Sequence, residues 1–169
     1  MTIKVAIVSD THAHLDARIA DVVKDCDYAI HAGDICGENI LESLEAMTGN
    51  LIAVAGNNDP YCHEKPLPDV STLDLPGGQL AIEHGHIHGM AKPCHDSLRK
   101  AHSNARVIIY GHTHKQIIDK SSMPWVINPG AAGQTRTNGG PSCLILEVSG
   151  EKLEQWQITP YRFPEKNAE

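Results

Sequence analysis

Five short apolar segments of this sequence each run directly into glycine or into carboxylate, amide and imidazole side chains. The segments lie within residues 3–8, 28–34, 51–59, 79–84 and 106–110. In chain order they end in Asp10-Thr11-His12, Gly33-Asp34, Gly56-Asn57-Asn58-Asp59, His84-Gly85-His86 and Gly111-His112-Thr113-His114. Because the carboxyl ends of the strands in an open α/β sheet form the ligand crevice, this pattern predicts one polar site at a sheet edge.

The first third of the chain is typical of strands that alternate with helices. Strands are expected at residues 3–8, 28–34 and 51–59. A first helix is expected after Asp16, which can cap it, and a second at residues 39–47, closed by Gly49. This order predicts parallel strands joined by right-handed crossovers.

The remaining chain is expected to be more antiparallel. Residues 60–76 are irregular, and residues 71–76 and 79–86 are expected to pair antiparallel around a turn at Gly77-Gly78. A helix near 93–104 and a buried strand at 106–112 follow. Alternating apolar and polar residues predict half-exposed antiparallel strands at 115–120, 125–130, 142–150 and 152–158.

We therefore expect an α/β fold in which two packed sheets, mixed parallel and antiparallel, are flanked by helices as an αββα sandwich. The length of the chain predicts a single domain over residues 1–169. Its C-terminal tail is expected to fray from about residue 160.

Composition disfavours several classes of function. A net charge of −7 disfavours binding to nucleic acid through a basic surface. The N-terminus has no signal-peptide pattern, and no apolar run has the length of a membrane span, so no membrane role is expected. Five widely spaced cysteines without a CxxC pair are typical of a cytoplasmic protein rather than of a disulfide framework.

Each polar motif taken alone has an ordinary structural explanation. An Asp after a strand is commonly a turn or cap residue, and Asn57 or His86 alone would be read as a loop residue. Their joint occurrence, each after an apolar strand, favours a metal site instead. Mixed nitrogen and oxygen ligands without thiolate suit Mn, Fe, Zn or Ni rather than a structural zinc cage or calcium.

The motifs SDTH, GD, GNND, HGH and GHTH resemble those of the calcineurin-like metallophosphoesterases, and NPGAAGQTR at 128–136 is similar to a stretch of their compact YfcE-like phosphodiesterase branch. The resemblance covers residues 3–158. It implies the metallophosphoesterase type of sandwich and two divalent metal ions per chain, of which Mn is the first expectation. One ion would be bound by Asp10, His12, Asp34 and His114, and the other by Asp34, Asn57, His84 and His112. The choice between His84 and His86 stays open, although the family pattern favours His84.

The resemblance implies hydrolysis of a small phosphoester, most simply a phosphodiester, with a metal-bridging hydroxide as nucleophile. Asn57, Asn58, Asp59 and His86 are the candidate catalytic residues beside the metal ions. Many relatives carry a histidine at the position of Asn58. An asparagine side chain, unlike that histidine, cannot act as an acid and donate a proton. We therefore expect a preference for diesters with good leaving groups and a modest turnover, unless His86 or His14 replaces that acid.

Five further residues have less specific expected roles. His31 is expected to be a hydrogen-bonded core histidine, and Trp125 and Trp156 to be packing residues. Asn128 is a candidate to brace a ligand, and Arg136 a candidate to contact a phosphate oxygen. Residues 60–76 and 86–95 are expected to shape substrate access.

Two alternative functions remain open from the sequence. One is a phosphomonoesterase or nucleotidase. The other is a non-catalytic scaffold like that of the eukaryotic retromer coat, which is disfavoured because all the ligand histidines are kept. Exposed antiparallel edge strands make a homodimer or higher homo-oligomer plausible.

Overall fold

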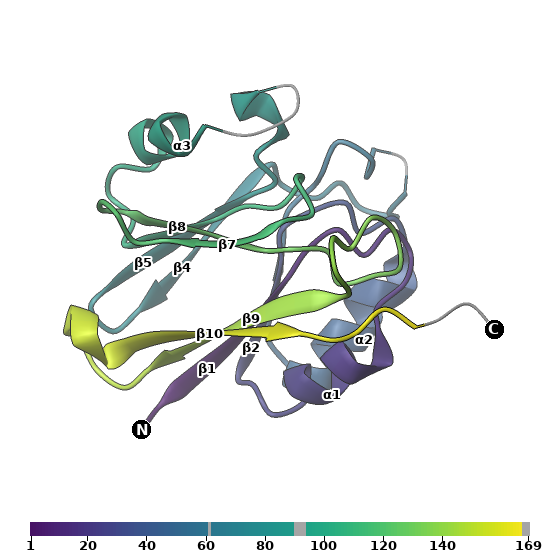
Figure 1. Cartoon of the computed structure of the whole chain (residues 1–169), viewed down its shortest axis with the longest axis horizontal. Coiled ribbons are helices and arrows are strands. Elements are labelled where there is room, and N and C mark those ends of the chain that lie inside the picture. The colour runs from purple at the N-terminus through teal and green to yellow at the C-terminus, as the bar shows by residue number, and fades with distance from the viewer. Residues whose placement is uncertain (61, 90–93, 167–169) are drawn as a thin grey trace.

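The computed structural model describes residues 1–60, 62–89 and 94–166, which form two five-stranded sheets packed face to face (Figure 1). The first sheet has the order β10-β9-β1-β2-β3, with β1 (Ile3–Val8), β2 (Tyr28–His31), β3 (Leu51–Ala53), β9 (Ser142–Val148) and β10 (Trp156–Arg162). The second sheet has the order β4-β5-β6-β8-β7, with β4 (Val70–Leu75), β5 (Gly78–Glu83), β6 (Val107–Ile109), β7 (Gln116–Asp119) and β8 (Trp125–Pro129).

Three helices cover the outer faces of the two sheets. Helices α1 (Ala17–Val23) and α2 (Glu38–Thr48) pack on the first sheet, and α3 (His95–Ala101) packs on the second. Alternation along β1 explains the layers, because Val5 and Ile7 enter the core between the sheets while Ala6 and Val8 face the helices. The expected αββα sandwich is confirmed.

The first third of the chain folds largely as expected. Strand β1 pairs parallel with β2, and β2 pairs parallel with β3. The Asp16 side chain accepts a hydrogen bond from the backbone nitrogen of Arg18 at the start of α1, and α2 ends at Gly49 in the left-handed conformation. The second and third strands are shorter than predicted, because the chain leaves the sheet before it reaches Asp34 and Asn57.

The second sheet is more parallel than the sequence suggested. Strands β5, β6 and β8 are mutually parallel, and only β4 and β7 at the two edges pair antiparallel. All residues of strand β8 are buried, and all but one of the residues of β9 are buried too. Both strands were expected to be half exposed, and neither is. The reason is that helices cover both sheets, and Val126 of β8 therefore packs beneath α3 while Ile127 faces the central core.

Two further boundaries differ from the expectation. The 3₁₀ helix η2 (Leu153–Gln155) occupies the start of the segment predicted as a strand from 152. Helix α3 begins at His95, and residue 93, where the helix near 93–104 was expected to begin, lies outside the described residues. Trp125 and Trp156 are both packing residues in the core between the sheets, as predicted.

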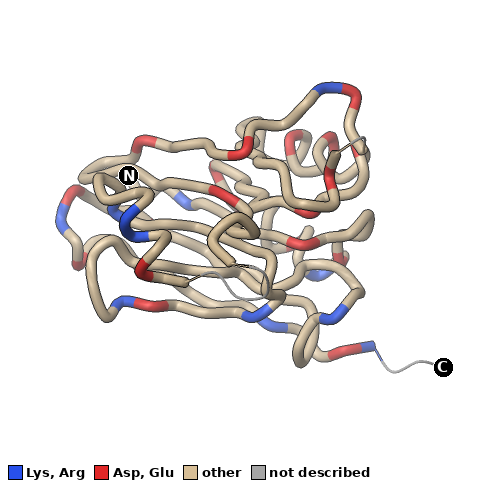
Figure 2. The backbone as a smooth tube through the Cα atoms, turned by 90° about the horizontal axis from the view of Figure 1, so that it is seen from above, with Lys and Arg blue, Asp and Glu red and all other residues tan. Residues whose placement is uncertain are grey.

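Charged residues are interleaved along the described chain. Figure 2 shows Lys and Arg spread over the molecule among Asp and Glu, rather than gathered on one face. No helix within the described ranges is long and apolar enough to cross a membrane.

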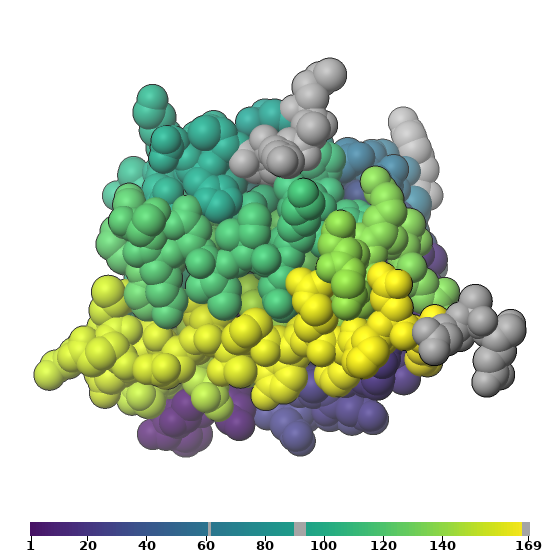
Figure 3. All heavy atoms as spheres, viewed as in Figure 1, coloured from purple at the N-terminus to yellow at the C-terminus, as the bar shows by residue number. Residues whose placement is uncertain are grey.

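The C-terminal segment stays ordered beyond residue 160, where fraying was expected. Strand β10 pairs with β9 as far as Arg162, and the backbone nitrogen of Phe163 donates a hydrogen bond to the carbonyl of Pro141. Figure 3 shows this segment lying along the side of the molecule, between the segments coloured green and the N-terminal segment. Its backbone hydrogen bonds and the packing of Phe163 under the first sheet explain why fraying does not begin at 160.

His31 closes β2 as a fully buried, hydrogen-bonded histidine, as predicted. Its Nε2 lies 2.9 Å from Oγ1 of Thr11, which itself donates to the carbonyl of Ile35, so that Nε2 carries the hydrogen. Its Nδ1 accepts a hydrogen bond from the backbone nitrogen of Gly33. The neutral ring therefore ties together the loops that follow β1 and β2, and burial lowers its pKa to about 4.

We expect His31 to make the protein less stable in weak acid. The folded-state pKa of about 4 lies below the ordinary value of 6.5, so between these pH values the unfolded chain binds the proton more readily. At about 1.4 kcal/mol per pKa unit, the free energy of unfolding should fall by about 3 kcal/mol as the pH drops through this window. Urea unfolding at several pH values should show this loss in the wild type and a flatter profile in His31→Gln, whereas parallel profiles would contradict it.

Candidate metal centre

The loops that follow β1, β2, β5 and β6 meet at one edge of the sandwich and bring the predicted ligands together. Four of the side chains are almost completely buried there, with exposed fractions of 0% for Asp10, 2% for Asp34, 1% for His84 and 3% for His114. Carboxylates are seldom buried without a compensating charge or hydrogen bond, so this edge is a specialised environment.

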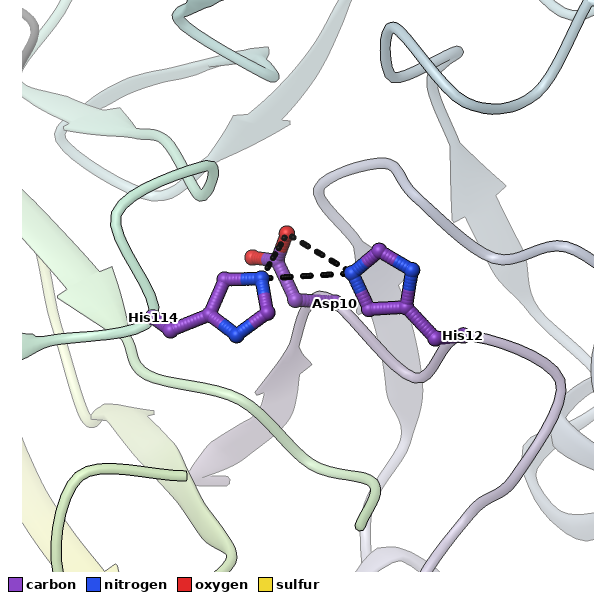
Figure 4. Close-up of side chains that lie close together, drawn as sticks. All are labelled: Asp10, His12 and His114. Carbon is purple, nitrogen blue, oxygen red and sulfur yellow. Dashed lines mark hydrogen bonds and ion pairs between the residues drawn. The ribbon is translucent and has the colours of Figure 1, made fainter. Parts of the chain in front are cut away.

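Asp10, His12 and His114 form the first group of possible ligands (Figure 4). Nε2 of His114 lies 3.3 Å from Oδ1 of Asp10 and 3.2 Å from Nε2 of His12. The two rings come from opposite sides, since His12 follows β1 and His114 follows β6, and their Nε2 atoms point toward each other beside the carboxylate.

Asp10, Asp34 and His84 form the second group. Nε2 of His84 lies 3.4 Å from Oδ2 of Asp34 and 3.9 Å from Oδ1 of Asp10. The same Oδ2 of Asp34 lies 3.7 Å from Nε2 of His12 in the first group. Asp34 therefore stands between the two groups, which is the position expected of a bridging carboxylate.

His112 lies beside the second group. Its backbone nitrogen donates a hydrogen bond to Oδ2 of Asp10, and its ring centroid is 5.2 Å from that of His84. His86 is the next ring outward, with its centroid 5.4 Å from His84 and 6.3 Å from His112. Because Nε2 of His84 is the atom that faces the carboxylates, the geometry favours His84 over His86 as a ligand.

Backbone carbonyls set the ring orientation of two of the histidines. Nδ1 of His84 donates to the carbonyl of Ala32 at 2.7 Å, and Nδ1 of His114 donates to the carbonyls of Thr135 and Arg136 at 3.0 and 3.2 Å. A hydrogen on Nδ1 leaves the lone pair of Nε2 directed into the site. Such outer hydrogen bonds are typical of histidines that bind a metal.

Two atoms of the site show that the residues fit a cation. Oδ1 of Asp10 and Nε2 of His84 are buried and have no hydrogen-bond partner among the described residues. A buried carboxylate oxygen and a buried imidazole nitrogen without partners are costly in a protein interior, and a divalent ion would satisfy both. The donor set of carboxylate oxygen and imidazole nitrogen is one that divalent transition metals accept.

The charges of the site are strongly coupled. Burial opposes ionisation of Asp34, but the interaction with the His84 ring 3.4 Å away and the hydrogen bonds from Asn58 outweigh it and lower the pKa of the carboxyl. Burial likewise disfavours a charged His84, but Asp34 and Asp10 outweigh it and raise the pKa of that ring. For His12 burial dominates and lowers the pKa. The site thus holds negative charge that attracts a cation.

The backbone around the site is strained in a way that the sequence did not reveal. Five of the seven predicted ligands have positive φ although none is glycine, namely Asp10 (53°), His12 (44°), Asp34 (55°), His112 (68°) and His114 (59°). Each such residue costs on the order of 1 kcal/mol or more, and clusters of them are typical of functional sites. The positive φ values turn these side chains, which come from separate loops, toward one point.

Glycines allow the close approach of these loops. A Cβ atom at Gly56 would collide with the carboxylate and backbone nitrogen of Asp34, and one at Gly111 would collide with the Ser9 hydroxyl and the Asp10 carboxylate. The Ser9 hydroxyl, which sequence reasoning missed, donates a hydrogen bond to Oδ2 of Asp10 at 2.7 Å.

The turn after β3 places its asparagines differently from the expectation. The backbone nitrogen of Asn58 donates to Oδ1 of Asp34, and its Nδ2 donates to Oδ2 at 2.7 Å. Both asparagines are exposed, and the hydrogen bonds identify Asn58 as the residue whose amide contacts the predicted bridging carboxylate.

Asp59 orients the loop rather than facing the site. Its carboxylate accepts hydrogen bonds from the backbone nitrogens of Asp34, Ile35, Cys36 and Gly56, at 2.7–2.9 Å. The ring of His63 completes this shell at 3.1 Å and also contacts Glu38. His63 lies in the irregular segment 60–76, where no local pattern marked it. Asp59 is therefore a positioning residue for Asp34, because its oxygens bind the backbone on either side of the site.

Asn128 and Arg136 support the loop that carries the GHTH motif. Nδ2 of Asn128 donates to the carbonyl of Gly111 and lies 3.1 Å from Oγ1 of Thr113, so Asn128 braces this loop as anticipated. The side chain of Arg136 is exposed, and its positive charge disfavours protonation of His12 and His114. Arg136 thus lies near enough to the first group to act on it electrostatically.

Comparison with known proteins agrees with this geometry. The calcineurin-like phosphoesterase superfamily domain matches residues 3–151. The phosphodiesterase MJ0936 of Methanocaldococcus jannaschii is 29% identical over 170 residues, which cover 92% of this chain and 98% of the relative.

Two solved structures show the same fold. An archaeal phosphodiesterase superposes with a TM-score of 0.72 at 25% identity, covering 95% of this chain and 100% of the other. Vacuolar protein sorting 29 from Cryptosporidium parvum superposes with a TM-score of 0.79 at 16% identity, covering 97% and 99%. The chain belongs to the calcineurin-like phosphoesterase superfamily.

Proposed function

We propose that this protein is a dinuclear metal-dependent phosphodiesterase that acts on a small phosphoester. The observation that carries the proposal is the pair of adjacent ligand groups, which share the carboxylate of Asp10 and have the carboxylate of Asp34 between them. Family membership supports phosphoester hydrolysis, and the similarity to MJ0936 supports a diester.

The two groups divide the ligands between two ions. Asp10, His12, Asp34 and His114 would hold one ion, and Asp34, Asn57, His84 and His112 the other, with manganese as the ion we propose first and iron, zinc or nickel as possible replacements. When bound, the ions supply positive charge that polarises the phosphoryl group and acidifies water to give the nucleophile.

The surrounding residues hold this arrangement and receive the substrate. Asn58 and Asp59 fix Asp34 through hydrogen bonds to its carboxylate and to its backbone. Arg136 is exposed close to the first group, where its guanidinium can bind a phosphate oxygen. His86 stands at the rim, and its lowered pKa, due mainly to burial, keeps it neutral at pH 7 and able to orient substrate by hydrogen bonding.

Diesters with good leaving groups are the favoured substrates. Asn58, which occupies the place of an acidic histidine in many relatives, donates its amide hydrogen to Asp34 and supplies no proton to a leaving group. A phosphomonoester would place a further negative charge beside the buried carboxylates. Rates on matched aryl monoesters and diesters separate the two substrate classes.

Less specific features support the proposed cellular location and substrate class. Five free cysteines support the cytoplasmic placement. The interleaved charges support a small substrate rather than nucleic acid, in accord with the net charge of −7. A homodimer or higher homo-oligomer stays a prediction.

Asp34→Asn should abolish most of the activity. Since loss even of residues that merely orient ligands costs about 10–100-fold, loss of the shared carboxylate should lower turnover of bis(p-nitrophenyl) phosphate with manganese by at least about 100-fold. Metal content should fall as well. Asp21→Asn, which removes an exposed carboxylate paired with Lys24, is the matched control and should retain activity. Full activity in Asp34→Asn would refute the proposed site.

Arg136→Gln should weaken substrate binding more than it slows the reaction. Hydrogen bonds to charged groups contribute about 1.5–3 kcal/mol, so KM for the diester should rise about 10-fold or more with metal content unchanged. Arg136→Lys should recover part of the loss because the positive charge returns. Lys100→Gln, on the exposed face of α3, controls for the change in net charge. An unchanged KM would exclude contact between Arg136 and the phosphate.

A further inference from the structure

A second cluster of metal-capable side chains lies on the other side of the second sheet. Glu83 ends β5, His88 ends the 3₁₀ helix η1 (His86–His88), and His102 caps the C-terminus of α3. One ligand atom from each lies within 4.8 Å of the others. All three side chains are largely buried, with exposed fractions of 4% for Glu83, 9% for His88 and 13% for His102.

This cluster is separate from the metal centre although Glu83 and His84 are neighbours in the chain. Along β5, Leu80 and Ile82 face the core between the sheets, whereas Ala81 packs beneath α3. Alternation therefore directs Glu83 to the α3 side and His84 to the metal centre. Figure 1 shows α3 on the outer face of this sheet.

The close contact between Glu83 and His88 does not have the geometry of a hydrogen bond. Oε1 of Glu83 and Nε2 of His88 are 2.8 Å apart, yet both atoms are buried and neither has a hydrogen-bond partner among the described residues. Nδ1 of His88 lies 2.7 Å from Oγ of Ser97, which is the outer hydrogen bond that a ligating histidine commonly makes. This contact engages Nδ1 and leaves Nε2, beside the carboxylate, as the atom of His88 available to a cation.

His102 completes the cluster from the opposite side of the carboxylate. Its Nε2 lies 2.5 Å from Oε2 of Glu83. Two imidazoles and one carboxylate thus converge in a largely buried space on the sheet, and Glu83 brings a negative charge that protein groups only partly satisfy. A cation bound by all three would satisfy both unpartnered atoms at once.

We propose that Glu83, His88 and His102 form an additional metal site of the zinc type. Two imidazole nitrogens with one carboxylate oxygen are a ligand set that Zn²⁺ binds well, and three protein ligands leave a fourth position for water. The nitrogen-rich set favours Zn²⁺, Co²⁺ or Ni²⁺ over Mg²⁺ and Ca²⁺, which prefer oxygen ligands.

The site would connect three elements of the fold. A bound ion would tie the end of β5 to η1 and to the C-terminus of α3. Because His86 begins η1, the ion would also fix the short helix that presents His86 to the metal centre. The role assigned to this site is therefore to hold one wall of the metal centre, and it does not depend on the reaction catalysed there.

Zinc stoichiometry tests the proposal. Purified full-length protein is loaded with ZnCl₂, freed of unbound metal by gel filtration, and measured by mass spectrometry of the metal. His88→Gln/His102→Gln should contain about one zinc ion per chain less than the wild type. His95→Gln is the matched control, since His95 lies on α3 but contacts Asp119 and Tyr110 instead. Asp34→Asn should lose zinc from the metal centre and keep this ion, which separates the two sites.

Anomalous scattering at the zinc edge from zinc-soaked wild-type crystals provides a test that needs no variant. A peak about 2.0–2.2 Å from Nε2 of His88, Nε2 of His102 and a carboxylate oxygen of Glu83 is expected. Equal zinc content in wild type and double variant, or the absence of a peak at this position, would overturn the proposal.

Discussion

Two buried carboxylates impose the constraint on which the rest of the structure depends. Removing a carboxylate from water costs several kcal/mol, and Asp10 and Asp34 are both almost fully buried at one sheet edge. Hydrogen bonds from Ser9 and Asn58 satisfy part of their capacity, and three imidazoles surround the remaining oxygens. Because Oδ1 of Asp10 stays without a hydrogen-bond partner among the described residues, protein groups alone do not complete the site. A cation is the natural complement to this arrangement.

The strained loops at this edge persist because buried hydrogen bonds hold them. Asp59 accepts from four backbone nitrogens, and His31 joins the loops after β1 and β2 through Thr11 and Gly33. Such bonds offset the cost of positive φ at the ligands. Asp59 and His31 therefore help to hold the ligands in position, although neither belongs to a ligand group. The family relationship and the geometry thus point to the same chemistry by independent routes.

Strand β5 supplies the site with a ligand on one face and a second polar cluster on the other. The alternation that places Ile82 in the central core also places Glu83 beneath α3, where a carboxylate needs partners of its own. His88 and His102 provide them from segments that are adjacent to the sheet only after folding. The group His84, His86 and His88, which looks like one motif in the sequence, is thereby divided between the two faces.

The sequence by itself determined the sandwich, the parallel first half and the gathering of polar residues after the strands, because local periodicity and glycine placement encode these features. It did not determine that β8 is parallel to β6, since an alternating pattern carries no information about strand direction. Nor did it distinguish Asn57 from Asn58 or show that Asp59 binds backbone nitrogens. Side-chain direction in the turn depends on φ and ψ values that distant loops impose. Only the tertiary structure decided these points, because contacts between residues far apart in the chain set them.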